Sequence, residues 1–265
     1  MALSPLLARY ENVVLDLDGC VWVGDHATPG APEAIAELRA AGKGLAFLTN
    51  NSRRSPEDYV RKLWSLGLQA SLEEVVTAGA AIQHVLAERG RGDAYVIGSE
   101  ALFRHVSDAG QRIVNGTRRA TAAEVVVVAG HDDFNYAELR DATQAVLAGA
   151  EMIAADRDRT FPQDDGFWPG SGAIVAALEY ATGRSARIVG KPEAQIFLTA
   201  LDRLDGGRTL VVGDRIDVDL AGAASAGLDA AIVLTGVATE AQARAATDPA
   251  PVAVAQDLRK LMVGS

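Results

Sequence analysis

The sequence predicts an α/β protein built on a parallel β-sheet, with a second α/β segment inserted into it. Apolar runs of strand length alternate with segments of helical periodicity near both ends of the 265-residue chain. Polar residues suited to catalysis directly follow several of these apolar runs. The middle of the chain has strand-like and helix-like segments of its own, and a segment of that size needs its own core.

The N-terminal part begins with two strand and helix pairs. The expected strands are 13–17 and 44–48, and the expected helices are 31–41 and 56–66. Pro32 near the start of the first helix and Gly42 after its end agree with the usual start and stop residues of helices. Ser55 and Pro56 open the second helix in the same way. This order of elements is typical of a parallel sheet.

The rest of the chain is expected to form one more piece of this sheet and one insertion. The C-terminal part predicts strands at 186–189, 209–212 and 230–234 and helices at 193–204 and 220–226. The middle predicts strands at 95–97, 124–129 and 152–154 and helices at 102–109 and 137–147. We therefore expect a discontinuous core domain of residues 1–79 and 188–265, interrupted by an α/β domain of residues 80–187. A helix expected at 77–88 leaves the first boundary open.

Composition limits the classes of function. The net charge of −10 and the pI near 4.9 argue against nucleic acid or an anionic membrane as the main partner, because both require a basic face. Short basic pairs such as Arg53 and Arg54 are interpreted as solvated surface. Cys20 is the single cysteine, so neither a disulfide framework nor a thiolate metal cluster is expected. With no signal-peptide pattern at the start and no membrane-length apolar run, we expect a cytoplasmic protein.

Two carboxylates, Asp16 and Asp18, come at the end of the first expected strand. Open α/β folds carry their chemistry at this end of the strands. The two acids are expected to have different roles rather than to act as a side-by-side dyad. A structural turn is the alternative, because Asp and Gly are common turn residues.

Hydroxyl, amide and ammonium groups follow two other apolar runs. Thr49 and Asn50 come after the expected strand 44–48, and groups of this type suit a phosphate dianion. Helix capping is the alternative role, which we favour for Ser52 and Ser55. Lys191 follows the expected strand 186–189 and supplies a positive charge for negative ligands.

Three carboxylates follow the expected strand 209–212 within six residues: Asp214, Asp217 and Asp219. Such a cluster repels itself unless a cation or Lys191 lies nearby. Mg²⁺ meets this need, because it binds a few carboxylates together with carbonyls and waters. The sequence thus predicts a magnesium site.

The four segments together resemble, in order and spacing, the motifs of the haloacid dehalogenase superfamily of phosphatases. They read Asp-Leu-Asp-Gly, Leu-Thr-Asn-Asn-Ser, Gly-Lys-Pro and Gly-Asp-Arg-x-Asp-x-Asp. These forms are similar to subclass IIA, the branch with the 4-nitrophenylphosphatases, phosphoglycolate phosphatases and pyridoxal phosphatases. The resemblance implies a Rossmann-like core and a large C2-type cap inserted between the second and third motifs, where the predicted insertion falls.

The resemblance also implies an activity. The chain would be a Mg²⁺-dependent phosphatase that hydrolyses small organic phosphomonoesters through an aspartyl-phosphate intermediate, and its partner would be a small phosphorylated metabolite. Asp16 would be the nucleophile. Asp18 would be the general acid for the leaving group and then the base for the hydrolytic water. Members of the family often dimerise through the cap.

The remaining motif residues are given binding roles by the same resemblance. Mg²⁺ would be held by Asp16, the Asp18 backbone carbonyl and Asp214, and the phosphoryl oxygens by Thr49, the Asn50 backbone and Lys191. Asp219 would orient the site without binding metal directly.

In the insertion, His131 and Phe161 fall where related enzymes carry substrate-selecting residues. The alternatives are a surface histidine at a strand end and packing within the cap. Cys20 is interpreted as a small packed hydrophobe, and Trp22 as packing near the entrance.

Two functions from other classes remain as alternatives. A phospho-accepting receiver module also places an acceptor Asp, a Thr and a Lys around Mg²⁺. Receivers have no acid two residues after the acceptor, however, and no inserted cap. A catalytically silent sensor of phosphate esters is the third possibility.

Overall fold

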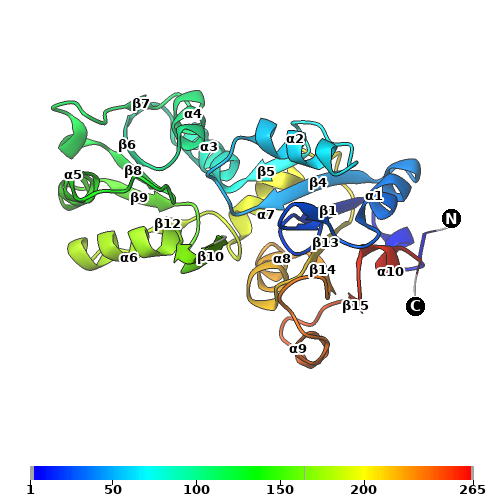
Figure 1. Ribbon diagram of the computed structural model, residues 1–265. Coiled ribbons are helices and arrows are strands. Elements are labelled where there is room, and N and C mark those ends of the chain that lie inside the picture. The colour runs from blue at the N-terminus through cyan, green and yellow to red at the C-terminus, as the bar shows by residue number, and fades with distance from the viewer. Residues whose placement is uncertain (1–2, 164, 264–265) are drawn as a thin grey trace. The chain divides into compact units, whose positions relative to one another are not determined.

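The computed structural model describes residues 3–163 and 165–263, and their contacts form two compact units (Figure 1). The first unit takes the chain up to Thr49, then Pro56–Val76, then the chain from Lys191 onward. The second takes Asn50–Ser55 and Thr77–Gly190. No helix in the described ranges is long and apolar enough to cross a membrane.

The first unit is built on a six-stranded sheet with the order β15-β14-β13-β1-β4-β5. Its strands are β1 (Asn12–Asp16), β4 (Gly44–Thr49), β5 (Val75–Thr77), β13 (Thr209–Gly213), β14 (Asp229–Val233) and β15 (Ala253–Ala255). Strand β1 pairs in parallel with β4 on one side and with β13 on the other. The chain thus builds the sheet outward in two directions from β1. Such a switch point leaves a crevice at the carboxyl ends of the strands, where open α/β sheets bind ligands.

Helices α1 (Ala31–Ala40), α2 (Pro56–Ser65) and α10 (Leu258–Val263) share one apolar core with this sheet. Val13, Leu15 and Phe47 of the strands are fully buried in that core. Helices α7 (Ala194–Leu201), α8 (Ala221–Ser225) and α9 (Glu240–Ala245) complete the unit. The near-continuous apolar strands are typical of a parallel sheet covered on both faces.

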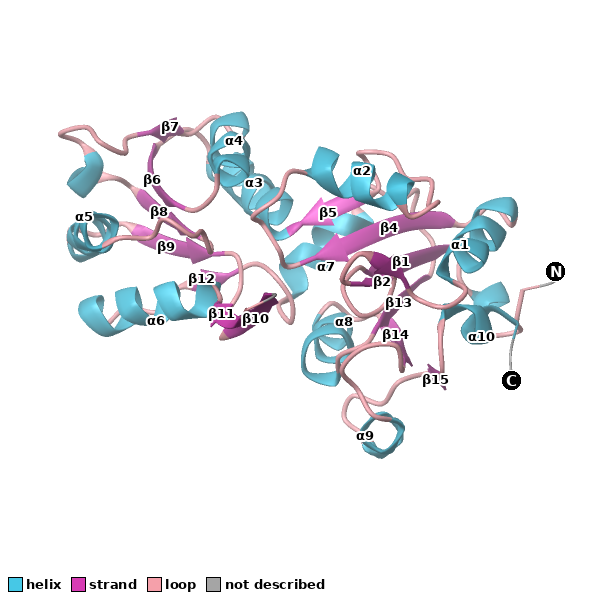
Figure 2. Cartoon of the chain, in the orientation of Figure 1, coloured by secondary structure: helices cyan, strands magenta, loops and turns pink. Residues whose placement is uncertain are grey.

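The second unit has its own five-stranded sheet with the order β12-β9-β8-β6-β7 (Figure 2). Its strands are β6 (Asp93–Ile97), β7 (Arg112–Ile113), β8 (Val125–Val128), β9 (Glu151–Ala154) and β12 (Arg187–Ile188). Helices α5 (Tyr136–Leu147) and α6 (Ser171–Thr182) pack with this sheet in a second apolar core. Helices α3 (Ala78–Arg89) and α4 (Glu100–Asp108) pack against each other. The predicted α/β class with parallel sheets is confirmed.

Two expectations about the course of the chain need correction. The strand expected at 186–189 was placed with the core, but Arg187 and Ile188 pair with Ile153 and Ala154 of β9 in the second sheet. Residue 80 lies inside α3, so the change of unit comes before that helix, after Val76. Thr77 caps α3, since its side chain accepts a hydrogen bond from the Ala80 N–H.

Two short hairpins were not predicted from the sequence. β2 (Trp22–Val23) pairs with β3 (His26–Ala27) in the first unit, and β10 (Thr160–Gln163) pairs with β11 (Gly166–Pro169) in the second. Two-residue strands and a strand that contains Pro162 give a weak periodicity signal.

Candidate active site

The predicted catalytic residues of the first unit lie at the carboxyl ends of three neighbouring strands. Asp16 is the last residue of β1, Thr49 is the last residue of β4, and Asp214 directly follows β13. All three residues are buried. The parallel pairing of these strands brings residues that are far apart in the sequence to the same edge of the sheet.

Lys191 joins two of the acids in a buried cluster. Its Nζ donates to Asp16 Oδ1 and, at 2.7 Å, to Asp219 Oδ1. Lys191 is 5% exposed and Asp219 is 1% exposed. Asp219 Oδ2 accepts further hydrogen bonds from the backbone N–H groups of Asp214 and Arg215. Both oxygens of Asp219 are therefore engaged within the protein, which suits an orienting role.

Burial is the largest single influence on the pKa values of this cluster. It raises the pKa of Asp16 well above the usual aspartate value, and Lys191 opposes this rise. Burial alone lowers the pKa of Lys191, but Asp16 and Asp219 outweigh it and hold that pKa above the ordinary value. Burial also raises the pKa of Asp214 to about 6. Positive charge near these carboxylates favours their ionised form, and Lys191 supplies one such charge.

The thiol of Cys20 lies close to the same acids. Burial, followed by the charge of Asp16, raises its pKa well above the usual value. The side chain is fully buried in the apolar core, as the sequence predicted.

Asp214 has one carboxylate oxygen that is available to bind a metal ion. Its Oδ2 accepts a hydrogen bond of 2.7 Å from the Val237 N–H, whereas its buried Oδ1 has no hydrogen-bond partner among the described residues. One carboxylate oxygen each of Asp16, Asp214 and Asp219 lies within 4.8 Å of the others. An unpartnered buried carboxylate oxygen is costly unless a cation meets it, and Mg²⁺ prefers such ligands. The donor set fits a magnesium ion.

Asp18 differs from the other acids because its side chain is exposed. Its Oδ1 accepts a hydrogen bond of 2.8 Å from Trp22 Nε1. The next residue, Gly19, has φ +92°, and a Cβ on it would lie 2.4 Å from Asp214 Oδ2. Only glycine fits this turn, which lets the chain pass beside Asp214 and turn back toward Trp22. Asp16 is thus buried and Asp18 exposed, so the two acids have different surroundings.

Asn50 follows Thr49 directly in the chain, but its contacts group it with the second unit. There it lies beside Gly190, where an added Cβ would come within 2.7 Å of Asn50 Oδ1. The residue after Thr49 and the residue before Lys191 are thus neighbours.

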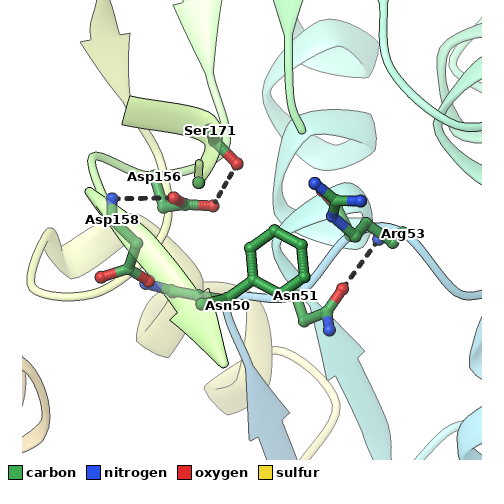
Figure 3. A pocket seen from close by; sticks show the side chains of 9 residues that line it. Asn50, Asn51, Arg53, Asp156, Asp158 and Ser171 are labelled. Carbon is green, nitrogen blue, oxygen red and sulfur yellow. Dashed lines mark hydrogen bonds between the residues drawn. The ribbon is translucent and has the colours of Figure 1, made fainter. Parts of the chain in front are cut away.

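Asn50 lines a small pocket in the second unit (Figure 3). Its lining residues come from the segment after β4, the loop after β9, strand β10 and the start of α6: Asn50, Asn51, Ser52, Arg53, Asp156, Asp158, Phe161, Gly170 and Ser171. The Arg53 guanidinium lies over the Phe161 ring, 4.2 Å from its centroid, and pairs with Asp132. Arg53 is therefore a fixed part of a pocket, and the interpretation of Arg53 as solvated surface is wrong.

A buried carboxylate, Asp156, organises one wall of this pocket. Its Oδ1 accepts from the Asp158 N–H at 2.9 Å, and its Oδ2 accepts from the Ser171 hydroxyl at 3.0 Å. The Ser171 oxygen in turn accepts from the Gly130 N–H. Burial, followed by the charge of Asp158, raises the pKa of Asp156 to about 7, while Arg53 opposes the rise.

The two residues expected to select substrate are placed differently from each other. Phe161 lines the pocket and meets Trp168 edge to face at 6.4 Å. His131 is not among the lining residues. Its Nε2 lies 3.2 Å from Glu138 Oε2, and its ring meets Phe134 edge to face. Arg53 was missed because it does not directly follow an apolar strand of the core.

Comparison with known proteins agrees with these motifs. Residues 13–112 match the family model of haloacid dehalogenase-like hydrolases, and residues 188–261 match a second model described as HAD-hydrolase-like. D-glycerol 3-phosphate phosphatase of Mycobacterium tuberculosis is 36% identical over 263 residues, which are 98% of this chain and 73% of that protein. Human chronophin is 35% identical, over 92% of this chain and 88% of that protein.

A solved structure gives the same result. The crystal structure of glycerol phosphate phosphatase from M. tuberculosis in complex with magnesium has a TM-score of 0.89 and 34% identity, and covers 98% of this chain and 78% of that one. These likenesses extend over nearly the whole chain, and they confirm the resemblance inferred from the four motifs. The chain therefore belongs to the haloacid dehalogenase-like hydrolase family.

Proposed function

We propose that the protein is a Mg²⁺-dependent phosphatase that hydrolyses small organic phosphomonoesters through a phosphorylated aspartate. The observation that carries this proposal is the buried Lys191–Asp16 pair beside Asp214, whose Oδ1 lacks a partner among the described residues. A nucleophilic carboxylate needs positive charge around it when it meets a phosphate dianion. Lys191 supplies one such charge, and Mg²⁺, held by Asp16, Asp214 and the Asp18 backbone carbonyl, would supply more.

In the proposed reaction, Asp16 attacks phosphorus and the bond to the leaving oxygen breaks. Asp18 gives its proton to that oxygen and then takes a proton from the water that hydrolyses the aspartyl phosphate. Its side chain is exposed and therefore open to the leaving group and to water. Lys191, the Thr49 hydroxyl and the Asn50 backbone N–H hold the phosphoryl oxygens. Asp219 keeps Lys191 in place.

For the substrate we propose a small metabolite phosphate, such as a glycerol phosphate, a sugar phosphate or phosphoglycolate, with 4-nitrophenyl phosphate as a laboratory substrate. The named phosphatases among the relatives support this class. We further propose that the second unit, Asn50–Ser55 and Thr77–Gly190, serves as a cap, in which Phe161 and His131 select the substrate and through which two copies can associate. Phe161 is favoured over His131, since only Phe161 lines the pocket of Asn50.

The test is release of inorganic phosphate from a panel of small phosphomonoesters, with Mg²⁺ and with EDTA. Asp16→Asn serves as the blank, because it keeps the size of the side chain and removes the nucleophile. We expect release that needs Mg²⁺ and that falls to the background level in Asp16→Asn. Release at a near-normal rate by Asp16→Asn contradicts the assignment of the nucleophile. Binding of esters without release from any of them favours the silent sensor.

A further inference from the structure

The exposed acid Asp18 is held by a buried tryptophan. Trp22 is 1% exposed, and its Nε1 lies 2.8 Å from Asp18 Oδ1. An exposed aspartate ordinarily samples several rotamers, whereas a proton donor must keep one geometry toward the leaving oxygen. The hydrogen bond to the buried indole therefore restricts the rotamers of the exposed carboxylate.

The ring itself is fixed by helix α2. Tyr59 lies parallel to it at a centroid distance of 6.3 Å, with an interplanar angle of 4°. Lys62 Nζ lies 4.5 Å from the centroid of the Trp22 ring and donates to the Gly24 carbonyl at 2.8 Å. A cation over an indole face is attracted by the ring, most strongly when the ring is desolvated. Two residues of one helix thus hold the indole in place.

Backbone hydrogen bonds also hold Asp18 and Trp22 together in one turn. The Gly19 N–H donates to the Trp22 carbonyl at 2.7 Å, and the Trp22 N–H donates to the Leu17 carbonyl at 3.0 Å. The turn from Leu17 to Trp22 is therefore a closed unit, so the distance between the indole N–H and the carboxylate is set by the backbone as well as by packing.

We propose that Trp22 is a positioning residue for acid–base catalysis by Asp18, an inference that rests on the proposed role of Asp18. The indole N–H occupies Oδ1 and leaves Oδ2 for the reaction. In the first step the proton on Oδ2 passes to the leaving oxygen as the phosphorus–oxygen bond breaks. In the second step Oδ2 takes a proton from the attacking water. The indole exchanges no proton and acts only by orienting the carboxylate.

The variant Trp22→Phe tests this inference, because it keeps an aromatic ring next to Tyr59 and Lys62 and removes the N–H. The readout is kcat/KM, which covers binding and transfer to Asp16, the step in which the leaving group departs. An alkyl phosphate taken from the panel needs the acid, whereas 4-nitrophenyl phosphate has a stable leaving group and needs it little. We expect kcat/KM to fall about tenfold for the alkyl ester and less than about twofold for the nitrophenyl ester.

Trp64→Phe is the matched control. Trp64 lies on α2 and also donates its indole N–H, at 2.8 Å, but to the backbone carbonyl of Ala70. The same substitution there removes one indole hydrogen bond without touching Asp18, and both esters should keep their rates. An equal fall for both esters in Trp22→Phe would mean a general structural effect and would overturn the inference.

A double-mutant cycle separates this inference from the proposed function on which it rests. Asp18→Asn alone should show the same preference for the nitrophenyl ester, and Trp22→Phe added to it should change the ratio of the two esters little. If Asp18→Asn lacks that preference, the acid role of Asp18 is wrong. If Asp18→Asn has it and Trp22→Phe does not, only the role of Trp22 is wrong.

If Trp22→Phe does not fold, Lys62→Gln gives the second test. It keeps the indole N–H and removes the cation that holds the ring. A smaller shift toward the nitrophenyl ester is expected, and an unchanged ratio overturns the inference.

Discussion

At the scale of single residues, aspartates of one covalent structure have different properties because their surroundings differ. Asp16 is buried and paired with Lys191, whereas Asp18 is exposed and held by an indole. Asp214 keeps one oxygen without a partner among the described residues, and Asp219 has both oxygens engaged. The proposed roles of nucleophile, acid, metal ligand and orienting group follow from these differences.

Lys191→Met is expected to destabilise the protein. It leaves Asp16 and Asp219 buried without their ammonium partner, and breaking a buried ion pair from one side costs about 3–5 kcal/mol. The loss should be smaller at low pH, where a proton replaces the lost cation. Urea unfolding in the presence of EDTA, at a low and at a higher pH, measures the loss of unfolding free energy. Lys260→Met, at an exposed position, is the control. A loss below about 1 kcal/mol contradicts the cost assigned to the buried pair.

Asp156 is expected to make stability depend on pH. Its pKa of about 7 in the folded protein is above the ordinary aspartate value, so the folded state binds a proton that the unfolded state releases. This stabilisation is complete below the unfolded pKa near 4 and is lost as pH rises through about 7. Its upper bound is about 4 kcal/mol, at about 1.4 kcal/mol per pKa unit.

Thermal unfolding of Asp156→Asn and of the wild type between pH 4 and 8 measures this dependence of stability on pH. The melting temperature of the wild type should fall as the pH rises. That of Asp156→Asn should fall much less, and at pH 8 it should be higher than that of the wild type. Asp108→Asn, at an exposed position of the same unit, should keep the wild-type profile. Parallel profiles for Asp156→Asn and the wild type would contradict the raised pKa.

The sequence predicted Asp16, Thr49 and Asp214 at one edge of the sheet because each follows an apolar strand, a local signal. It did not predict the place of Arg53, because Phe161, the ring that the guanidinium covers, lies more than a hundred residues away in the chain. A contact of that sequence separation leaves no trace in local periodicity.

At the scale of elements, helix α5 of the second unit and helix α9 of the first unit each start with a complete capping box. Asn135 caps α5 in the second unit with Glu138, and Thr239 caps α9 in the first unit with Gln242. These boxes satisfy N–H groups that the first turn of a helix leaves unpaired.

Asn135→Ala and Thr239→Ala are each expected to lower stability by about 1 kcal/mol. Calorimetry measures the loss, and hydrogen exchange locates it, with faster exchange in the unit that carries the substitution. Asn135→Ser keeps a capping oxygen and should restore most of the loss. An Asn135→Ala protein as stable as the wild type would mean that this cap contributes little.

Periodicity predicted the longer strands and helices but not the edges of the sheets. β12 was assigned to the core because it immediately precedes the Gly-Lys-Pro segment, yet its two residues pair with β9. An edge strand of two residues forms by pairing with a neighbouring strand, and its own sequence does not show which strand that is.

At the scale of the whole molecule, the chain forms two separately cored units. The residues of the proposed chemistry lie in the first unit except for Asn50, which lies in the second unit and lines its pocket. An insertion was predicted because the middle of the chain has its own strands and helices. The grouping of Asn50–Ser55 with the second unit was not predicted, since the sequence there reads as a simple continuation after β4.

Mg²⁺ should stabilise the first unit selectively. A ligand that binds only the folded state adds RT ln(1 + [L]/Kd), about 2.7 kcal/mol at a hundredfold excess over Kd, and the gain goes to the cooperative unit that contains the ligands. Asp16 and Asp214 both belong to the first unit. Hydrogen exchange with Mg²⁺ and with EDTA should therefore show slower exchange in β1 and β13 and little change in β6 and β8. Asp214→Asn should remove most of the gain, because it replaces the carboxylate whose Oδ1 is left for the ion. Equal slowing in both sheets would show that the two units open as one, and no slowing in either would contradict the magnesium site.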